Sequence, residues 1–485
     1  MMKAPTRIIA LLFISSQIIF TSLAAAQEDD DEVVTLSPYQ IEDDAHVGYL
    51  ATTTLAGSRL NTALKDIPAT VHVFTQEFIE DIGAIDLEDI LLYSTNTIKN
   101  ADEEDFFSGA FDVRAELSFR ALVRGLPATR ARNFFRWQLP TDTYNSGSLE
   151  ESRGPNGILF GIGGPGGVTN QSTKRARLGR DSYQAQVKIG KNSLRRYTLD
   201  INKVLIEDKL AIRIDALYHD ADGWRLYDRE TKKAQYGSLV YRPFEGTTIH
   251  VAYENYDRND SVSRNVTTSL YTTKAWETAG RPTYDVVNSA APSNPTLFGV
   301  GLQRQNNNQR VTIFDQEAGS IAGQVKDLRQ QLYTRNRDPN GSGGFDVNDF
   351  VYPQALFPTD VSVEGPGQQR WLDYQDLMIQ LDQKLADRLF LHLGYNNTDS
   401  FWDALEGRGS TPGGPFGSIQ GDANEVFRDG TANPYAGDYY VDYAARRPIN
   451  AKDIETKRAA ISYEWDFSDW SDGWLGSLGR HRFAA

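Results

Sequence analysis

Residues 151–175 read ESRGPNGILFGIGGPGGVTNQSTKR, and this stretch decides the fold class. Seven of the fourteen residues from Gly154 to Gly167 are glycine, with apolar side chains between them. Glycine lets a backbone approach its neighbours closely and adopt left-handed turns that other residues avoid. The stretch therefore predicts a backbone segment packed tightly inside other parts of the molecule.

After this stretch, from residue 181 onward, apolar and polar residues alternate with a period of two. Such alternation is typical of strands in a sheet that has one apolar and one polar face. Short turns are predicted at 207–209, 243–246 and 385–387, whereas other connections are as long as residues 257–374. Short turns at one end and long loops at the other are typical of an outer-membrane β-barrel. A large secreted β-protein is the alternative.

Before the glycine-rich stretch, residues 49–177 read as a compact α+β unit. Residues 70–74 alternate as a strand does. Thr75 and Asp86 stand where the N-caps of two short helices are expected, because apolar residues at helical spacing follow each of them. The sequence therefore predicts a mainly β chain, with an α+β domain followed by an antiparallel transmembrane β-barrel.

Composition removes several classes of protein. The chain has 485 residues and no cysteine, which excludes disulfide scaffolds, thiol catalysis and cysteine-bound metal centres. With 50 basic and 65 acidic side chains, its net charge of −15 argues against a binder of nucleic acid. The histidines are scattered, and the sequence holds no His-Glu-x-x-His, nucleophile-elbow or phosphate-loop motif. We therefore expect no enzyme activity.

Three motifs in order resemble the plug domain of TonB-dependent outer-membrane receptors. They are an Arg-Gly step at 123–126, an Arg-Gly-Pro run at 151–161, and a Gly-Gly-Val-x-Asn strand with a Thr-Lys-Arg exit at 163–175. The resemblance implies that the plug signature residues are Arg124, Gly125, Arg153, Gly154, Pro155, Gly161, Gly166, Gly167 and Asn170.

Two of these residues, Arg124 and Arg153, are candidates for buried ion pairs with carboxylates of the barrel wall. A guanidinium suits this role because it pairs with a carboxylate through two parallel hydrogen bonds. Cohesion within the plug itself is the alternative role for both arginines.

The N-terminus reads as a secretory signal, with Lys3 and Arg7 before an apolar run and alanines before the expected cleavage site. We expect residues 1–26 to be this signal and residues 27–48 to be a flexible acidic tail. The resemblance implies that the tail carries a TonB box, which binds the energy-transducing TonB protein. An ordinary solvated tail is the alternative. The residues of the box are Glu32, Val33, Val34, Thr35 and Leu36.

The resemblance also implies the organisation of the remaining chain. Residues 49–177 are expected to form the plug, and residues 178–485 the N-terminal part of the barrel. The alternating pattern predicts eight strands up to Trp465 and a ninth that begins near His481. Because plugged transporters have about 22 strands, we expect the barrel to be incomplete at the C-terminus of this sequence.

The expected function is energised uptake of a scarce ligand across the outer membrane of a Gram-negative cell, with a ferric siderophore as the first expectation. The alternatives are a receptor for oligosaccharide or cobalamin, a truncated non-transporting remnant, and a surface binding protein without uptake. The implied partners are the TonB protein, outer-membrane lipid, the barrel assembly machinery and the small ligand.

Two further segments are candidate binding sites. Phe134, Phe135, Arg136 and Trp137 form an aromatic and basic cluster that suits a ring-bearing or anionic ligand, and packing against the barrel wall is the alternative. Residues 338–349 place oxygen ligands at the spacing of a calcium loop. A solvated, turn-rich loop is the alternative there, and no other cofactor is expected. The candidate calcium ligands are Asp338, Asn340, Ser342, Asp346 and Asp349.

Overall fold

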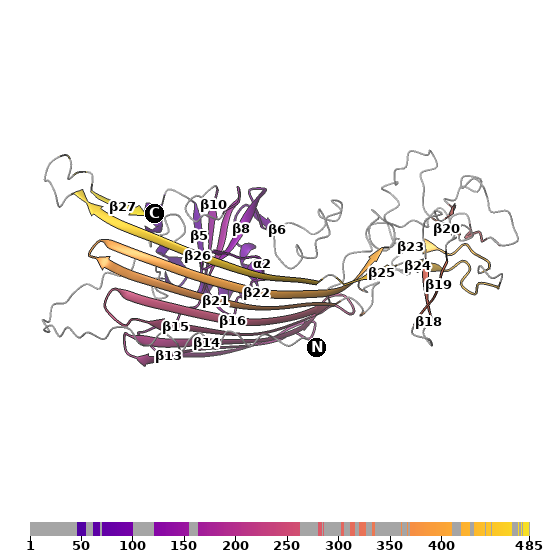
Figure 1. Ribbon diagram of the computed structural model, residues 1–485, viewed down its shortest axis with the longest axis horizontal. Helices are drawn as coiled ribbons and strands as arrows, with labels where there is room; N and C mark the ends of the chain where they lie inside the picture. Colours follow the sequence, from indigo (N-terminus) through magenta and orange to yellow (C-terminus); the bar gives the residue numbers. More distant parts are fainter. Residues whose placement is uncertain are drawn as a thin grey trace. The chain divides into compact units, whose positions relative to one another are not determined.

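A computed structural model shows the architecture of the chain (Figure 1). The described elements form two main β-sheets, here called the plug sheet and the wall. The structure describes residues 46–54, 62–67, 70–99, 121–154, 163–261, 280–283, 285, 302–304, 311–315, 320–325, 332–334, 360, 366, 369–409, 419–426, 431–441, 443–447, 449–467, 474, 477 and 479–484.

The plug sheet has seven strands in the order β5-β10-β11-β8-β7-β6, with β9 paired to β8. β11 runs antiparallel to β10 and parallel to β8. The stretch of residues 151–175 contains the end of β10 and all of β11. The strands are β5 (Val71–Thr75), β6 (Thr97–Lys99), β7 (Ala121–Val123), β8 (Leu126–Arg132), β9 (Phe135–Arg136), β10 (Ser146–Arg153) and β11 (Gly167–Thr173).

Among the described residues of the plug are two short α-helices, α1 (Gln76–Asp81) and α2 (Leu87–Leu91). Thr75 caps α1 and Asp86 caps α2, as the sequence predicts, because each side chain accepts hydrogen bonds from backbone N–H groups of the first helical turn. The helices bury apolar side chains against β5 and β10. This core comprises Phe74, Ile79, Ala84, Leu87, Ile90, Leu91 and Leu149.

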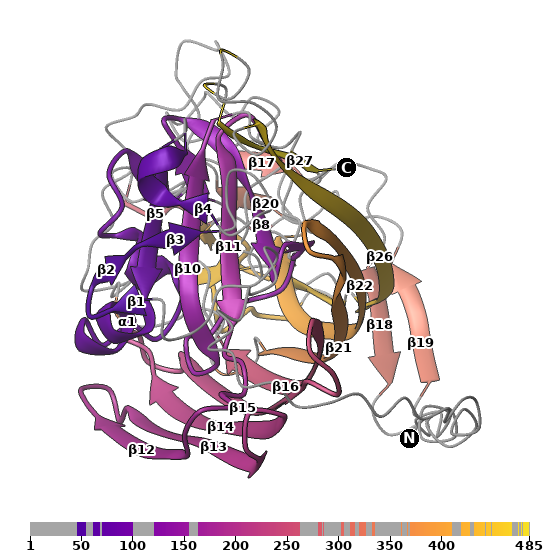
Figure 2. The ribbon, with the colours of Figure 1, turned by 90° about the vertical axis from the view of Figure 1, so that its left-hand side faces the viewer.

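The wall is an antiparallel sheet in the order β12-β13-β14-β15-β16-β21-β22-β26-β27, with β25 paired to β22. Figure 2 shows its strands side by side in this order. The strands are β12 (Ser182–Ile189), β13 (Arg195–Ile206), β14 (Leu210–Asp222), β15 (Arg229–Tyr241), β16 (Thr247–Ser261), β21 (Gln369–Ala386), β22 (Leu389–Gly409), β25 (Tyr443–Arg446), β26 (Ile449–Asp466) and β27 (Arg480–Ala484).

The wall confirms the predicted strand pattern. Eight strands along the main path run up to β26, which contains Trp465, and the ninth, β27, begins at Arg480. The tight turns occupy 207–209, 242–246 and 387–388. The third turn begins two residues later than predicted, because β21 continues to Ala386. The fold is therefore mainly β, an α+β plug followed by an antiparallel sheet.

Side chains of the wall alternate between two faces. In β16, Glu254 and Tyr256 are buried, whereas Tyr253, Asn255 and Asp257 are exposed. The buried face packs against the plug, because one apolar cluster contains residues of both sheets. The cluster comprises Phe135, Trp137 and Tyr144 of the plug with Leu217, Ala234, Tyr236, Ala252, Tyr256, Leu372, Tyr374, Met378, Trp402 and Ala404 of the wall.

The remaining described elements are short. No helix among the described residues is long and apolar enough to span a membrane. These elements are β1 (His46–Val47), β2 (Leu50–Ala51), β3 (Thr53–Thr54), β4 (Thr62–Ala63), the 3-10 helix Leu64–Asp66, β17 (Leu302–Arg304), β18 (Val311–Asp315), β19 (Ser320–Val325), β20 (Leu332–Thr334), β23 (Ile419–Gly421) and β24 (Tyr439–Val441).

Candidate functional site at the plug–wall seam

The Arg-Gly step of the sequence is the two-residue turn between β7 and β8. Arg124 and Gly125 have φ angles of 53° and 76°, both in the left-handed region. A tight hairpin loop of this type requires positive φ at both positions. The side chain of Arg124 is exposed, so it does not form the buried ion pair with the wall for which it was a candidate.

Close backbone approach explains two signature glycines at the start of β11, Gly166 just before the strand and Gly167 as its first residue. A Cβ on Gly166 would lie 2.3 Å from the carbonyl oxygen of Leu126, and one on Gly167 would lie 2.0 Å from that of Ser152. Gly167 also has a φ of 119°, which other residues rarely adopt. Only glycine at these positions lets β11 pair with β8 and β10 at once.

Arg153 lies in a polar cluster inside the plug. Its guanidinium donates to the carboxylate of Glu151 at 3.1 Å and to the Ser94 hydroxyl at 2.9 Å. Glu151 also accepts hydrogen bonds from the hydroxyls of Ser94 and Thr97. The ion pair of Arg153 is thus made within the plug, which is the cohesive role, and the carboxylate is not one of the wall.

Asn170 fastens the turn between β8 and β9. The turn residues Asn133 and Phe134 both have left-handed φ angles, 48° and 62°, and a left-handed conformation costs a non-glycine residue about 1–2 kcal/mol. The side-chain oxygen of Asn170 accepts a hydrogen bond from the backbone N–H of Phe134 at 2.8 Å. The side chain of Asn133 is held in turn by the hydroxyl and backbone of Thr173. Asn170 therefore stabilises a strained turn.

The segment that the sequence offered as a ligand contact divides into two pairs. Phe135 and Trp137 are buried in the apolar cluster shared with the wall, and the ring of Trp137 meets that of Tyr374 edge-on at 5.4 Å. Packing against the wall, the alternative reading, therefore describes these two residues. Phe134 is half-buried and Arg136 is exposed.

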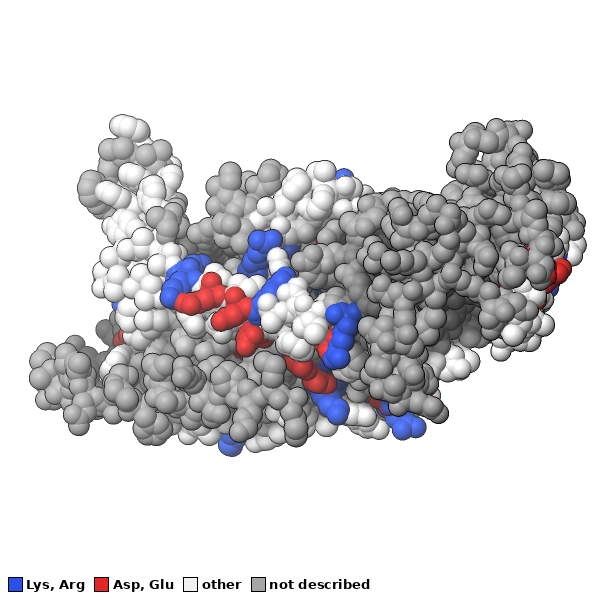
Figure 3. Space-filling model, turned by 45° about the vertical axis from the view of Figure 1, so that its right-hand side comes forward, with Lys and Arg blue, Asp and Glu red and all other residues white. Residues whose placement is uncertain are grey.

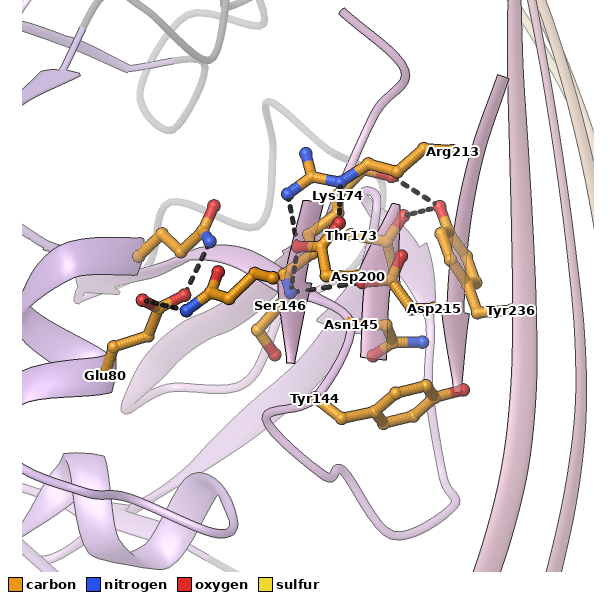
Figure 4. A network of polar contacts seen from close by, with 12 residues as sticks. Glu80, Tyr144, Asn145, Ser146, Thr173, Lys174, Asp200, Arg213, Asp215 and Tyr236 are labelled. Carbon is orange, nitrogen blue, oxygen red and sulfur yellow. Dashed lines mark hydrogen bonds and ion pairs between the residues drawn. The ribbon is translucent and has the colours of Figure 1, made fainter. Parts of the chain in front are cut away.

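The contact between plug and wall, here called the seam, holds a network of buried charges (Figure 4). Lys174, at the end of the plug, donates to Asp200 of β13 at 2.8 Å and to Asp215 of β14 at 3.1 Å. Arg213 binds the same Asp200 through two hydrogen bonds of 2.8 and 2.7 Å. The hydroxyl of Tyr236 donates to the backbone carbonyl of Lys174 at 2.7 Å. Two cations and two carboxylates thus compensate one another in a largely buried contact.

A second buried pair joins the plug residue Asp142 to Arg196 of β13. The guanidinium of Arg196 donates to both carboxylate oxygens, at 3.0 and 2.6 Å, and each side chain is 2% exposed. Burial alone raises the pKa of Asp142, but the charge and hydrogen bonds of Arg196 outweigh it and hold the pKa below its usual value. The pair therefore remains ionised at neutral pH.

A third set of plug residues converges on Glu254 of β16. The carboxylate of Glu254 pairs with Arg132, and it accepts hydrogen bonds from the Tyr144 hydroxyl at 2.5 Å and the Asn145 amide at 3.1 Å. Burial, followed by the nearby charge of Glu254, raises the pKa of Tyr144 well above its usual value. The phenol therefore keeps its proton and acts as a donor.

Beside these pairs, a small polar pocket of about 40 Å³, open to solvent, lies between α1 and the first two wall strands. Glu80 of α1 accepts hydrogen bonds there from Gln76 at 2.6 Å and from Gln184 of β12 at 3.3 Å. The pocket separates the helical side of the plug from the wall. Its polar lining includes Gln76, Glu80, Thr143, Tyr144, Ser146, Lys174, Gln184, Gln186, Lys188, Arg196, Thr198 and Asp200.

From the sequence, Lys174 was included in the Thr-Lys-Arg motif but was assigned no role. Asp142, Tyr144 and Asn145 were not identified as site residues. The wall partners carried a signal, because charged residues at alternate positions of predicted strands must face a polar interior. The plug partners lie in a loop without periodicity, so nothing in the sequence marked them.

Several candidate residues lie outside the residues that the structure describes. They are the TonB box from Glu32 to Leu36, the signature residues Pro155 and Gly161, and the calcium loop from Asp338 to Asp349. Within the described part of the chain, no cluster of three or more histidine, aspartate or glutamate side chains is placed to hold a metal ion.

Comparisons with known proteins agree with this geometry. No protein-family model matches the chain. The chain is 32% identical over 163 residues to a probable TonB-dependent receptor, BfrD, of Bordetella pertussis, covering 33% of this chain and 20% of that protein. It is 26% identical over 211 residues to the catecholate siderophore receptor Fiu of Escherichia coli K12, covering 41% of this chain and 26% of Fiu.

The fold is that of a solved receptor. A crystal structure of the ferric-catecholate import receptor Fiu superposes with a TM-score of 0.53 at 16% identity, over 86% of this chain and 50% of that chain. The aligned sequence spans only about a quarter of the length of these two relatives, 20% of BfrD and 26% of Fiu. The chain is thus similar to TonB-dependent receptors over part of their length.

Proposed function

We propose that this chain is part of a receptor that takes up a ferric siderophore across the outer membrane, with energy supplied through the TonB protein. The observation that carries the proposal is the seam, where three sets of buried charges seat a folded plug against the inner face of the wall. The names of the relatives support the cargo class, since one is a catecholate siderophore receptor.

The chemistry of the seam suits a closed gate that opens only under load. Removing one partner of a buried ion pair costs about 3–5 kcal/mol, because the other charge stays buried without compensation. When the two surfaces separate, by contrast, both partners of each pair are exposed to water and become hydrated, so the seam can open and close again. A plug held by such pairs closes a pore and still requires energy to move.

The described surface fits a transporter better than a binder of nucleic acid. On the face that Figure 3 shows, the coloured basic and acidic side chains lie side by side. A nucleic-acid interface needs a basic surface that follows the phosphate backbone. The mixed charges of this face, with the net charge of −15, support the reading of a transport receptor rather than a nucleic-acid binder.

The proposal is tested by measuring uptake of radioactive iron as a ferric catecholate chelate. Cells that produce the complete receptor are compared with cells that lack it, with and without an uncoupler of the proton gradient. We expect uptake that needs both the receptor and the gradient. Binding without uptake would contradict the transport proposal, and uptake of labelled cobalamin or oligosaccharide instead would contradict the cargo class.

The proposed energy coupling rests on the TonB box from Glu32 to Leu36. Such a segment would pair with its partner as an added strand, and proline cannot donate the backbone hydrogen bond that a strand requires. We expect Val34→Pro to abolish energised uptake while surface binding of the chelate is unchanged. Val34→Ile, which keeps a β-branched residue, is the control, and undiminished uptake by Val34→Pro would place the coupling elsewhere.

A further inference from the structure

A further contact between plug and wall lies at the turn between β8 and β9. The ring of Phe135, in the plug, is buried, and the guanidinium of Arg458, in β26, lies over it at 4.5 Å from the ring centroid. The same guanidinium donates a hydrogen bond to the carbonyl oxygen of Phe134 at 3.2 Å. One wall residue therefore holds both a plug side chain and the backbone of the strained turn.

The wall makes room for this ring by means of a glycine. Gly394 of β22 pairs directly with Arg458 across the strands. A Cβ at Gly394 would lie 3.1 Å from the Cζ atom of Phe135 and 3.6 Å from the Nε atom of Arg458. The distance to Phe135 is tighter than ordinary contacts between carbon atoms, which lie at about 3.5–4.0 Å. The missing side chain thus provides the slot that Phe135 occupies.

Two buried wall residues orient Arg458. His392 Nδ1 donates to Asp382 at 2.7 Å, and His392 Nε2 accepts a hydrogen bond from Arg458 at 3.0 Å. The two bonds fix the neutral imidazole in one tautomer, because a nitrogen that accepts from a guanidinium carries no proton. Asp382 and His392 are 2% and 5% exposed, so this support is shielded from water.

We propose that Gly394, Arg458, His392 and Asp382 form a socket for Phe135 that latches the plug to strands β21, β22 and β26. Arg458 is the positioning residue that closes the socket. It holds the left-handed Asn133–Phe134 turn from the wall side, while Asn170 holds the same turn from inside the plug. The role of the latch in gating rests on the proposed uptake function, but the latch itself is a contact that exists without cargo.

The test uses the absence of cysteine from the chain. Ala460, 5% exposed and directly opposite His392 in the wall, is replaced by cysteine, which becomes the single thiol of these 485 residues, and any cysteine of the receptor outside them is replaced by serine. Its labelling rate by a maleimide is measured on the complete receptor in membranes, without cargo and without an energy source. The labelling rate therefore does not depend on uptake, and a failed uptake experiment does not affect it.

Two variants open the socket by opposite means. Arg458→Gln removes the cation and its hydrogen bonds, and Gly394→Ala fills the slot and displaces the Phe135 ring. Because each change removes the equivalent of a hydrogen bond or a ring contact, we expect labelling to become about tenfold faster in both. Arg458→Lys, which keeps the charge but loses the planar fork, should show a smaller increase.

The control is Arg447→Gln, which removes an arginine that is exposed and pairs with Asp403 outside the socket. It should label at the parental rate. Faster labelling in Arg458→Gln alone would overturn the latch, because the smaller side chain then merely leaves a hole beside Ala460. Parental labelling in Gly394→Ala would also overturn it. If Arg458→Gln does not accumulate in membranes, the single variants Phe135→Leu and Gly394→Ala are compared instead. Both should then label faster than the parent, and parental labelling in either would overturn the latch.

Discussion

At the scale of single residues, the Asp142–Arg196 pair allows a measurement of how firmly the plug is seated. Arg196→Ala leaves Asp142 buried without its bidentate partner, and Lys232 at 4.0 Å compensates only in part. We expect a loss of about 3–5 kcal/mol in the free energy that holds the plug, measured as protease resistance of the plug in increasing urea. Arg447→Ala, which removes the 63% exposed partner of Asp403, should cost about 0–1 kcal/mol. Equal losses would mean that the buried pair contributes no more than a surface pair.

A second residue-scale prediction concerns Asp86, the cap of α2. Burial and then the neighbouring charge of Asp89 raise the pKa of Asp86 from 3.8 to about 6. The folded protein therefore keeps a proton between pH 4 and 6 that the unfolded chain has released, so the contribution of Asp86 to stability falls as pH rises through this window. The full shift corresponds to about 3 kcal/mol at most, and to less because the carboxyl is only partly buried.

Asp86→Asn tests this sign, because asparagine also caps helices well but does not titrate. The variant should be more stable than the parent at pH 7, and the difference should shrink toward pH 4, in urea unfolding followed at both values. A parent that gains stability between pH 4 and 6 relative to the variant would show that the pKa is lowered instead.

At the scale of elements, the β10–β11 pairing depends on glycine. Gly167→Ala places a Cβ 2.0 Å from the carbonyl oxygen of Ser152, and the φ of 119° is strained for alanine. Clash and strain together should destabilise the plug by more than about 3 kcal/mol, seen as loss of protease resistance. Gly179→Ala is the matched control, since a Cβ there meets nothing within 4 Å. A plug that tolerates both substitutions equally would contradict the role assigned to close backbone approach.

The same elements show how far sequence reasoning reaches. The caps Thr75 and Asp86, the tight turns and the order of the wall strands follow from local rules, because capping and alternation involve residues close in the chain. The seam does not follow, since Lys174 meets Asp215 across 41 positions and Tyr144 meets Glu254 across 110. Such partners depend on how the two sheets are placed. For the same reason, the sequence alone does not decide whether Phe135 contacts a ligand or packs against the wall. The contact of Phe135 with the wall at Gly394 decides for packing.

At the scale of the whole molecule, the exposed face of the wall changes character along its strands. In β22, Leu393 and Tyr395 are followed on the same face by Asn397 and Asp399. The adjacent strand β26 repeats the change, since Ala459 pairs with Leu393 and Glu455 pairs with Asn397. An apolar band bordered by aromatic and then polar residues is what a transmembrane barrel presents to lipid. The face therefore predicts where the membrane ends.

A pair of matched substitutions tests this boundary. Leu393→Arg places a charge inside the apolar band, where arginine costs about 2–4 kcal/mol in a membrane barrel, so the protein should accumulate poorly in membranes. Asn397→Arg lies on the same strand and the same face, beside Glu455 and Asp453, and should be tolerated. The measured quantity is the amount of folded, protease-resistant protein in the membrane fraction. If both variants accumulate equally well, the apolar band does not contact lipid, and the secreted β-protein that the sequence left as an alternative becomes the better description of the wall.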